Sequence, residues 1–492
     1  MGDLLGIGKT GLFASKKSLE VTGHNLSNVN TEGYSRQKVS QSTAIPVSVA
    51  GFVQGAGVSV NGINRINDEF IDKKLANSLS SSKYFDTRTD QLAQVESIFN
   101  EIDSDGLNQV LNKFFNAFRD LANQPENETI RSVVRDNATL VVKDFRRIRE
   151  SLDLQAQSID SKIKTSVSEI NQILNHVADL NQKITALEAQ QGETGDYRDQ
   201  RDLALRKLSE HFKITTYADE KNRYVISAQG IGTLVTGANV QELAVKTFNA
   251  EQSSNNMNGS TEVVLKDRPS QIVTDQFQQG SLTGMIKVRN GDIKKFQEDI
   301  DDIAYQFAKA VNDVHRQGFV NRKINLDAEQ SKLDRSLASF DNKGQVNQID
   351  FFAPLESSSG AAMSINISDA VLNDLSNIAT AKDPNSPGDN RIAIAISKLQ
   401  HERILGEGTI TLEEKYLQTI GRVGLESGKA RLDAEQANGI LAQAVNLRER
   451  MSGVSIDEET ANMVRFQQAY QASAKVMQAA DEMFKTVLDI KR

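Results

Sequence analysis

The amino-acid sequence predicts an α+β multidomain chain with terminal coiled-coil helices, a helical-bundle middle domain and inserted β-rich outer domains. Three observations carry this prediction. Apolar and small residues recur at alternating steps of three and four near both ends of the 492-residue chain, as in the seam of a coiled coil. A further heptad run from Ile163 to Leu187 predicts a long bundle helix. At Phe212 the pattern changes to short runs of Val, Ile, Thr and Tyr, which are typical of strands.

The first predicted helix begins at Leu4 and ends near Asn28, where Asn, Thr and Gly favour turns and left-handed backbone. Its seam alternates leucines with small residues such as Gly8 and Ser15. The predicted subunit-packing leucines of this helix are Leu5, Leu12, Leu19 and Leu26.

The last predicted helix spans 456–490 and keeps the same rhythm. Gly453 breaks the preceding helix, and Ser455 followed by Glu458 has the spacing of a capping box. Its predicted subunit-packing residues are Met463, Phe466, Tyr470, Met477 and Phe484. We expect the two terminal helices to pack along each other and along neighbouring copies.

An energy estimate sets the expectation for the free monomer. Burial of the four seam leucines contributes roughly 6–12 kcal/mol. Ordering the backbone of such a helix costs roughly 1–2 kcal/mol per residue. The hypothesis is that the chain ends stay poorly ordered until neighbouring copies bury both stripes.

Between the ends, helical and extended patterns alternate. The heptad run could instead be an ordinary buried helix of a globular core. The remaining helices are predicted at 68–123, 129–154, 284–317, 392–404, 412–425 and 428–450, and extended segments at 37–64, 212–279 and 323–376, with a linker at 383–389. The predicted domains are 1–40 with 455–492 as a terminal coiled-coil layer, 41–211 with 281–318 and 390–454 as a rod-like helical domain, and 212–280 with 319–389 as β-rich outer inserts.

Composition excludes several classes of function. The 57 basic and 65 acidic side chains give a net charge of −8, which argues against a nucleic-acid partner. No apolar run is long enough for membrane insertion. Cysteine is absent, so neither disulfides nor thiolate sites are possible. Without a secretory signal, these facts alone favour a cytoplasmic protein.

Three motifs that suggest chemistry fail on inspection. Gly6 to Thr10 ends like a phosphate-binding loop, but Asp3 stands where that motif needs glycine. Acidic residues at 101–105 resemble the start of a calcium loop, but Asn112 occupies the position of the bidentate glutamate. The five histidines never pair at metal-ligand spacing. We therefore expect no catalytic residue, no cofactor and no metal.

The polar loop after the first helix carries a family resemblance. The run from His24 to Tyr34 resembles the N-terminal signature of bacterial flagellar axial proteins, which comprise rod, hook and hook-associated proteins. The Ser35-Arg36-Gln37 sequence that follows is similar to the hook-associated members at the hook–filament junction. His24 departs from the family, which usually has Asn there. The signature-loop residues are Asn25, Asn28, Thr31, Gly33, Tyr34 and Arg36.

Further matching blocks lie along the chain. The C-terminal blocks 453–459, 466–472 and 480–484 are similar to the same hook-associated members. Shorter matches occur at 121–125 and 284–286, so the resemblance covers the frame of the chain and leaves much of the middle unmatched.

The resemblance implies a structural, non-enzymatic component of the bacterial flagellum. It implies export through a type III channel that reads an uncleaved N-terminus, and a secreted, extracellular location at the hook–filament junction, which reverses the cytoplasmic expectation. The implied partners are copies of the chain in a helical lattice, the hook protein, hook-associated protein 3, the export apparatus and a dedicated export chaperone.

Two alternatives stay open. Another axial component, a hook or rod protein, would share the N-terminal signature. A cytoplasmic coiled-coil adaptor, or an enzyme with an unrecognised site in the β insert, would form a compact oligomer without export. For the signature loop, capping the first helix and contacting a stacked subunit are complementary roles.

Overall fold

The computed structural model describes residues 2–49, 52–99, 106–190, 192–220, 223–248, 260–320, 339–340, 346–384, 386–406 and 408–490. Contacts between elements divide the chain into two compact units. Unit 1 comprises Met1–Asp86, Ile163–Gly284 and Asp433–Arg492, and unit 2 comprises Thr87–Lys162 and Met285–Leu432. The helices α2 (Glu69–Phe99), α4 (Glu128–Glu188) and α12 (Leu412–Ser452) contribute to both units.

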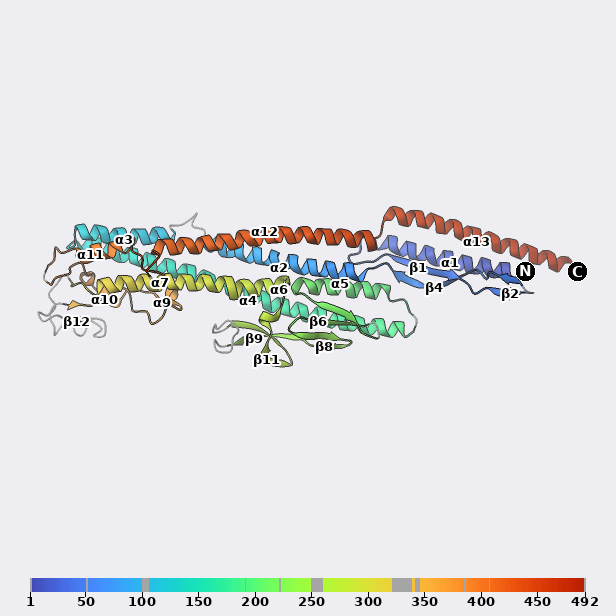
Figure 1. Ribbon diagram of the computed structural model, residues 1–492, viewed down its shortest axis with the longest axis horizontal. Coiled ribbons are helices and arrows are strands. Elements are labelled where there is room, and N and C mark those ends of the chain that lie inside the picture. Colours follow the sequence, from blue (N-terminus) through green and yellow to red (C-terminus); the bar gives the residue numbers. More distant parts are fainter. Residues whose placement is uncertain are drawn as a thin grey trace. The chain divides into compact units, whose positions relative to one another are not determined.

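In unit 1 the two ends of the chain form an antiparallel helix pair, α1 (Gly2–Ser27) and α13 (Ile456–Ile490) (Figure 1). The two backbones approach closely. A Cβ atom on Gly8 would lie 2.7 Å from Met477 Cγ, and one on Gly11 would lie 2.9 Å from Ser473 Oγ. The pairing of sequence ends is therefore as predicted, and small residues of α1 make the closest contacts.

A β-hairpin packs against α1. Its long strands, β1 (Gln37–Thr43) and β4 (Val58–Arg65), are antiparallel with a register shift between Ser40 and Gln41. The shorter strands β2 (Val47–Val49) and β3 (Phe52–Gln54) extend the same hairpin. These strands confirm the extended pieces predicted at 37–64.

Two antiparallel sheets of unit 1 dock on α4 through asparagines. The amide of Asn171 donates to Leu243 O at 2.7 Å and accepts from Leu243 N at 2.9 Å. Asn181 accepts from Tyr224 N at 3.1 Å and donates to Gly237 O. Each asparagine thereby satisfies backbone groups of one sheet.

The strand order is β5-β6-β7-β8 in one sheet and β11-β10-β9 in the other. The strands are β5 (Thr215–Ala218), β6 (Tyr224–Ala228), β7 (Gly232–Thr236), β8 (Asn239–Val240), β9 (Leu243–Phe248), β10 (Ser260–Leu265) and β11 (Arg268–Ile272). The change to strands after Phe212 is confirmed. The remaining helices of this unit are α5 (Gly195–His211) and the short η2 (Thr274–Gln276).

Unit 2 is a helical bundle around an aromatic core. Phe114 of α3 (Leu107–Asn123) makes edge contacts with Phe307 of α7 (Lys294–His315) and with Phe351. Its smaller elements are the π-helical η3 (Val288–Ile293), β12 (Ser339–Phe340), β13 (Val346–Asn347), α9 (Ala361–Ser364), α10 (Asp369–Asn373), η4 (Leu375–Asn377) and α11 (Arg391–Lys398). The short helix α6 (Gly280–Lys287) begins in unit 1 and ends in unit 2. Edge-to-face aromatic packing stabilises this core beyond simple burial.

Several predicted helix boundaries are wrong. The single helix predicted at 68–123 is two helices, α2 and α3. Conversely, the helices predicted at 129–154 and 163–187 are one helix, α4, and those at 412–425 and 428–450 are also one, α12. A mid-helix Gly such as Gly428 is tolerated because it leaves the backbone hydrogen-bond ladder intact. The helix predicted at 392–404 ends at Lys398.

Two further expectations concern the middle of the chain. The segment predicted as strand and loop at 323–376 contains the short helices α9 and α10 in its described part. Glu101, Asp103 and Asp105, which resembled a calcium loop, lie outside the described residues. Within the described ranges, no helix has the length and apolar character needed to cross a membrane. The three-layer division of domains stays a prediction.

Candidate subunit-packing surfaces and the signature loop

The predicted seam residues of the terminal helices are not fully buried within the chain. Leu5 is 46% exposed, Tyr470 36% and Phe484 56%. The half-buried members are Leu12, Leu19, Leu26, Met463, Phe466 and Met477. Small and polar residues fill the buried face of α1, namely Gly8, Ala14, Ser15, Ser18, Val21, Thr22 and Asn25. The contact between α1 and α13 therefore leaves much of the apolar seam accessible.

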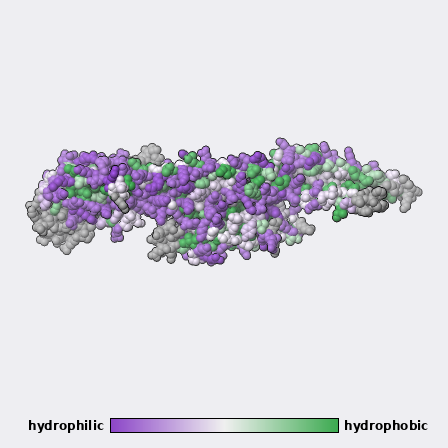
Figure 2. Space-filling model, in the orientation of Figure 1, coloured by the Kyte–Doolittle hydropathy of each residue, from purple (hydrophilic) through white to green (hydrophobic). Residues whose placement is uncertain are grey.

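More apolar side chains accompany the predicted seam. Phe13 is 58% exposed on α1, and Ile456 is 55% exposed at the start of α13. Other exposed apolar residues of the two helices are Leu4, Ile7, Val464, Val476, Met483 and Leu488. Figure 2 shows hydrophobic surface among hydrophilic atoms along these helices. The heptad reading missed Phe13 because it lies off the leucine seam.

The signature loop folds around Asn25, which is 1% exposed. Its amide nitrogen donates to Gln37 O at 2.9 Å and to Glu459 Oε2 at 3.0 Å. Its amide oxygen accepts from Gln37 N at 2.9 Å and from the Tyr34 hydroxyl at 2.8 Å. One buried amide thus joins the end of α1, the first strand and the start of α13.

Tyr34 is the second buried member of the loop. Its hydroxyl lies 3.0 Å from His24 Nδ1, and the two rings meet edge to face. Burial raises the pKa of Tyr34 well above its usual value, and the carboxylates of Asp196, Asp199 and Glu459 act in the same direction. The phenol is therefore neutral and acts as a hydrogen-bond donor to Asn25.

Arg36 links the loop to α13 and α12. Its Nε donates to Glu459 Oε1 at 2.8 Å, and its Nη1 donates to Glu458 Oε2 at 2.8 Å. Its backbone amide donates to Ser452 O at 2.9 Å. Glu459 is 2% exposed, so Arg36 supplies the cation that this buried carboxylate requires.

The end of α12 holds the other side of the loop. Arg448 donates through Nη2 to Gly33 O at 3.1 Å and to Tyr34 O at 2.8 Å. Gly33 has φ +86, and a Cβ there would lie 3.2 Å from Leu203 Cβ. Both the backbone conformation and the neighbouring helix therefore require glycine.

Acidic residues of α5 complete the network. Ser35 N donates to Asp199 Oδ2 at 3.1 Å, and Arg65 of β4 lies 3.3 Å from Asp199 Oδ1. Burial raises the pKa of Asp199, while Arg65 and the Ser35 amide oppose that shift. Gln37 also donates to Asp196 Oδ1 at 2.9 Å.

Two signature-loop residues, Asn28 and Thr31, and the neighbouring Glu32 face the surface to different degrees. Asn28 is half-buried and its amide nitrogen donates to His24 O at 3.0 Å, which continues the helix end. Thr31 is exposed and its hydroxyl donates to Asn28 Oδ1 at 3.2 Å. Glu32, between Thr31 and Gly33, is also exposed. These residues form the outer edge of the loop.

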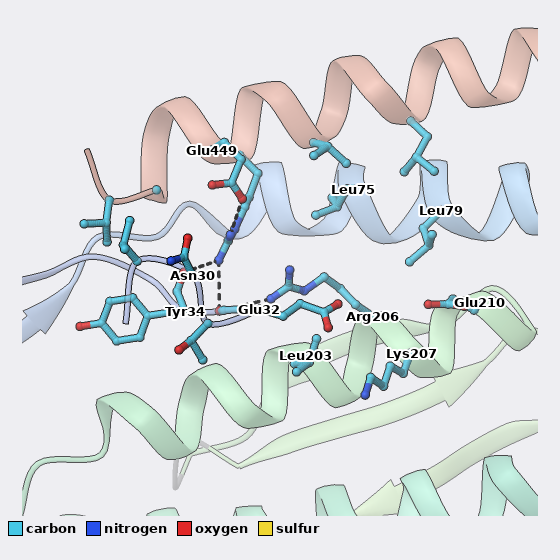
Figure 3. Close-up of a pocket in the computed structure, with 18 residues that line it drawn as sticks. Asn30, Glu32, Tyr34, Leu75, Leu79, Leu203, Arg206, Lys207, Glu210 and Glu449 are labelled. Carbon is cyan, nitrogen blue, oxygen red and sulfur yellow. Dashed lines mark hydrogen bonds and ion pairs between the residues drawn. The ribbon is translucent and has the colours of Figure 1, made fainter. Parts of the chain in front are cut away.

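A cavity of about 420 Å³ lies beside this outer edge (Figure 3). Leu75 and Leu79 of α2 and Leu203 of α5 line it with apolar surface, and Arg206 and Glu449 add charge. Burial lowers the pKa of Arg206. The cavity combines an apolar lining with charged groups.

Sequence reasoning located the loop but missed its partners. The sequence places Glu459 only at the end of the matching block 453–459, and Arg448 and Asp199 carry no signal at all. The capping box is half formed, because Glu458 N donates to Ser455 Oγ at 3.5 Å while the Glu458 carboxylate accepts from Arg36. Among the described residues no group of three or more His, Asp or Glu could hold a metal ion.

Comparison with known proteins places the chain in a family. The model of the flagellar hook-associated protein FlgK helical domain matches residues 92–328, and that of the flagellar basal body rod FlgEFG protein C-terminal region matches 448–490. Flagellar hook-associated protein 1 of Bacillus subtilis is 30% identical over 97% of this chain and 96% of its own length. The chain belongs to the flagellar hook-associated protein 1 family.

Other members of the hook-associated protein 1 family agree. The Escherichia coli protein of that name is 24% identical, with both chains covered completely. The solved structure of the flagellar hook junction protein FlgK from Burkholderia pseudomallei has a TM-score of 0.63 at 14% identity, covering 78% of this chain and all of that one, which shows a shared fold. Membership makes this chain a structural component of the flagellum and confirms the resemblance and the α+β multidomain fold.

Proposed function

We propose that this chain forms the hook–filament junction of the bacterial flagellum by self-assembly of its terminal helices after type III export. The observation that carries the proposal is the accessible apolar seam on α1 and α13 in a member of the hook-associated protein 1 family. Exposed apolar stripes of this extent mark surfaces that another protein covers. Repeated copies supply such a cover on every subunit.

The signature loop contributes in two ways. Asn25, Tyr34 and Arg36 use their polar atoms within the chain, where they set the angle between the terminal helices and the rest of unit 1. The exposed edge at Asn28, Thr31 and Glu32, together with the adjacent cavity, is available to a stacked subunit. This division supports the complementary roles expected for the loop.

The proposed partners follow from the proposed place of this chain between hook and filament. The hook protein lies below and hook-associated protein 3 above, and copies of this chain lie alongside. The export apparatus reads the N-terminus, and a dedicated chaperone covers the apolar face of α13 before export. The proposed location is extracellular, and we propose no catalytic role and no cofactor.

The alternative of a hook or rod protein has less support. The model shared with rod proteins covers only 448–490, whereas the relatives that match along the whole chain are hook-associated proteins. The test is a secretion assay in a strain that exports flagellar proteins but lacks this gene. We expect the full chain in the medium or on flagella and restored motility; retention in the cytoplasm as a compact oligomer would favour an adaptor.

A further inference from the structure

A second accessible stripe lies on the part of α12 that belongs to unit 2. Leu417 is 52% exposed, Leu425 70% and Leu432 66%. Gly421, Gly424 and Gly428 recur between these leucines at steps of three and four, so all six residues share one helix face. Arg431, seven positions after Gly424, lies at the border of this face and is its one charged residue between 417 and 432.

The opposite face of α12 is fixed in the bundle. Tyr416, Thr419 and Val423 are buried, and Arg422 Nη1 donates to Asp299 of α7 at 2.8 Å. Lys415 reaches the same carboxylate at 3.0 Å. These contacts set the rotation of the helix and hold the glycine–leucine stripe outward.

Nothing within the chain requires glycine at these three positions. A Cβ added at Gly421, Gly424 or Gly428 would meet nothing within 4 Å, and none of the three has positive φ. Glycine weakens a helix interior relative to alanine. Three glycines on one exposed face therefore fit a surface that another helix approaches closely, with the leucines as the rim of the groove.

We infer that this stripe seats the helix α4 of a second copy of the chain. The outer face of α4 in unit 2 carries Val133 and Leu140, which are 45% and 46% exposed and seven residues apart. Gly421 and Gly428 have the same separation. Val133 opposite Gly421 and Leu140 opposite Gly428 place two side chains into two glycine gaps with a common period.

The direction of the two helices sets how they pair. The two helices run in the same direction within unit 2 (Figure 1). When long helices lie along the axis of a helical lattice, the copies related by that axis keep these helices parallel. The α4 helix of one copy therefore pairs in parallel with α12 of the next. Because the contact joins a face of α4 to a different face on α12, it propagates around a lattice instead of closing a dimer.

This inference rests on the proposed function, because it names the lateral contact by which copies assemble. The absence of native cysteine allows a direct test. The double variant Leu140→Cys with Gly428→Cys is expressed in the strain lacking the gene, and intact flagella are oxidised mildly. We expect a ladder of cross-linked chains, because opposed residues at a glycine contact come within disulfide distance.

Controls isolate the contact. Each single variant should give no ladder, and a mixture of the two single-cysteine chains should give dimers only, which excludes a cross-link inside one chain. Lys309→Cys with Gly428→Cys serves as the matched pair, since Lys309 is exposed on α7 of the same unit. Val133→Cys with Gly421→Cys tests the second predicted contact independently.

A second variant tests assembly without cross-linking. Gly428→Gln fills the gap with the side chain of a good helix former, so we expect an unchanged or raised Tm but at least a tenfold loss of motile cells. The control Lys429→Gln, at the next position, should change neither the Tm nor motility. Normal motility of Gly428→Gln, or assembled flagella that give no cross-link at either pair, would overturn the inference. Failure of the wild-type chain to restore filaments would instead refute the proposed function.

Discussion

The guanidinium of Arg36 and the buried carboxylate of Glu459 form an ion pair, with Arg36 Nη2 2.7 Å from Glu459 Oε1. The two residues stand 423 positions apart, one just after α1 and the other in the first turn of α13. The same carboxylate accepts from Asn25 through its other oxygen. This pair fixes the direction in which α1 and α13 leave the rest of unit 1.

Loss of Arg36 tests the pair. Arg36→Ala leaves the carboxylate of Glu459 buried without its cation, which should lower the free energy of unfolding by about 3 kcal/mol. Urea unfolding followed by circular dichroism measures the change. The control is Glu458→Gln at the exposed partner of Arg36, which should change stability by less than about 1 kcal/mol. Equal effects of the two variants would contradict the account.

Gly57 tests the seat of the hairpin on α1. It has φ +95, and a Cβ there would lie 2.2 Å from Thr10 Oγ1 and 3.3 Å from Ile7 Cα. Gly57→Ala should therefore loosen the hairpin and cost about 1–3 kcal/mol. Gly55→Ala is the matched control, because nothing lies within 4 Å of its Cβ. Hydrogen exchange of β1 and β4 should rise only in the first variant.

His315 predicts a pH dependence of unit 2. Its Nε2 accepts from Ala379 N at 2.8 Å and its Nδ1 lies 2.7 Å from Ile349 O, which requires the neutral ring. Burial lowers its pKa to about 4. In the unfolded chain the pKa of histidine is about 6.5. Between pH 6.5 and pH 4 the unfolded chain therefore binds more protons than the folded chain. The contribution of His315 to the free energy of unfolding is complete above about pH 6.5 and falls by about 3 kcal/mol as the pH drops to about 4.

The urea midpoint of unfolding, measured from pH 7 to pH 4, tests this pH dependence of stability. His315→Gln, although less stable at pH 7, should lose less of its stability over that interval than the wild type. A wild-type profile that is flat between pH 6.5 and pH 4 would show that His315 does not titrate in this way.

The terminal seam predicts separate effects on folding and assembly. Leu19→Asp or Phe466→Asp places a charge where a neighbouring subunit desolvates the helix. We expect both variants to keep the urea midpoint of the middle of the chain and to lose motility. Gln467→Asp, at an exposed polar neighbour, is the control and should swim. Normal filament attachment in Phe466→Asp cells would count against the packing scheme.

Order of the terminal helices in the free chain is a further prediction. Because α1 and α13 contact each other mainly through small residues, we expect the parts of both helices beyond the hairpin contacts and the Glu459 anchor to be poorly ordered in the monomer and to fold in the lattice. The ellipticity at 222 nm of the full-length monomer should exceed that of a chain lacking both helices by far less than their length requires. The full helical increment in the monomer would disprove this.

Periodic residues made the terminal helices predictable from the sequence. The leucine rhythm of α1, the end of that helix near Asn28 and the break at Gly453 all reflect local preferences, which a single sequence displays. The same holds for the strands after Phe212. Boundaries inside long helices were wrong because tertiary packing of α12 and α4 overrides weak local preference, as at Gly428.

The partners of the signature loop could not be predicted. Asn25 and Tyr34 stood out as turn residues, but Glu459 and Arg448 lie more than 400 positions away, and nothing local distinguishes them from solvated charges. Only the fold shows that these side chains are buried. Gly421 and Gly424 fell inside the predicted helix 412–425 without a role, and Gly428 marked the start of the next predicted helix, since exposure of a helix face is a property of the packed bundle.

The most direct test of the central claim is electron microscopy of flagella from a strain that lacks this gene. A junction role predicts complete hooks without filaments, with filament subunits released into the medium, and restoration by the wild-type chain. Missing hooks would indicate a rod or hook component, and normal filaments on normal hooks would contradict the account.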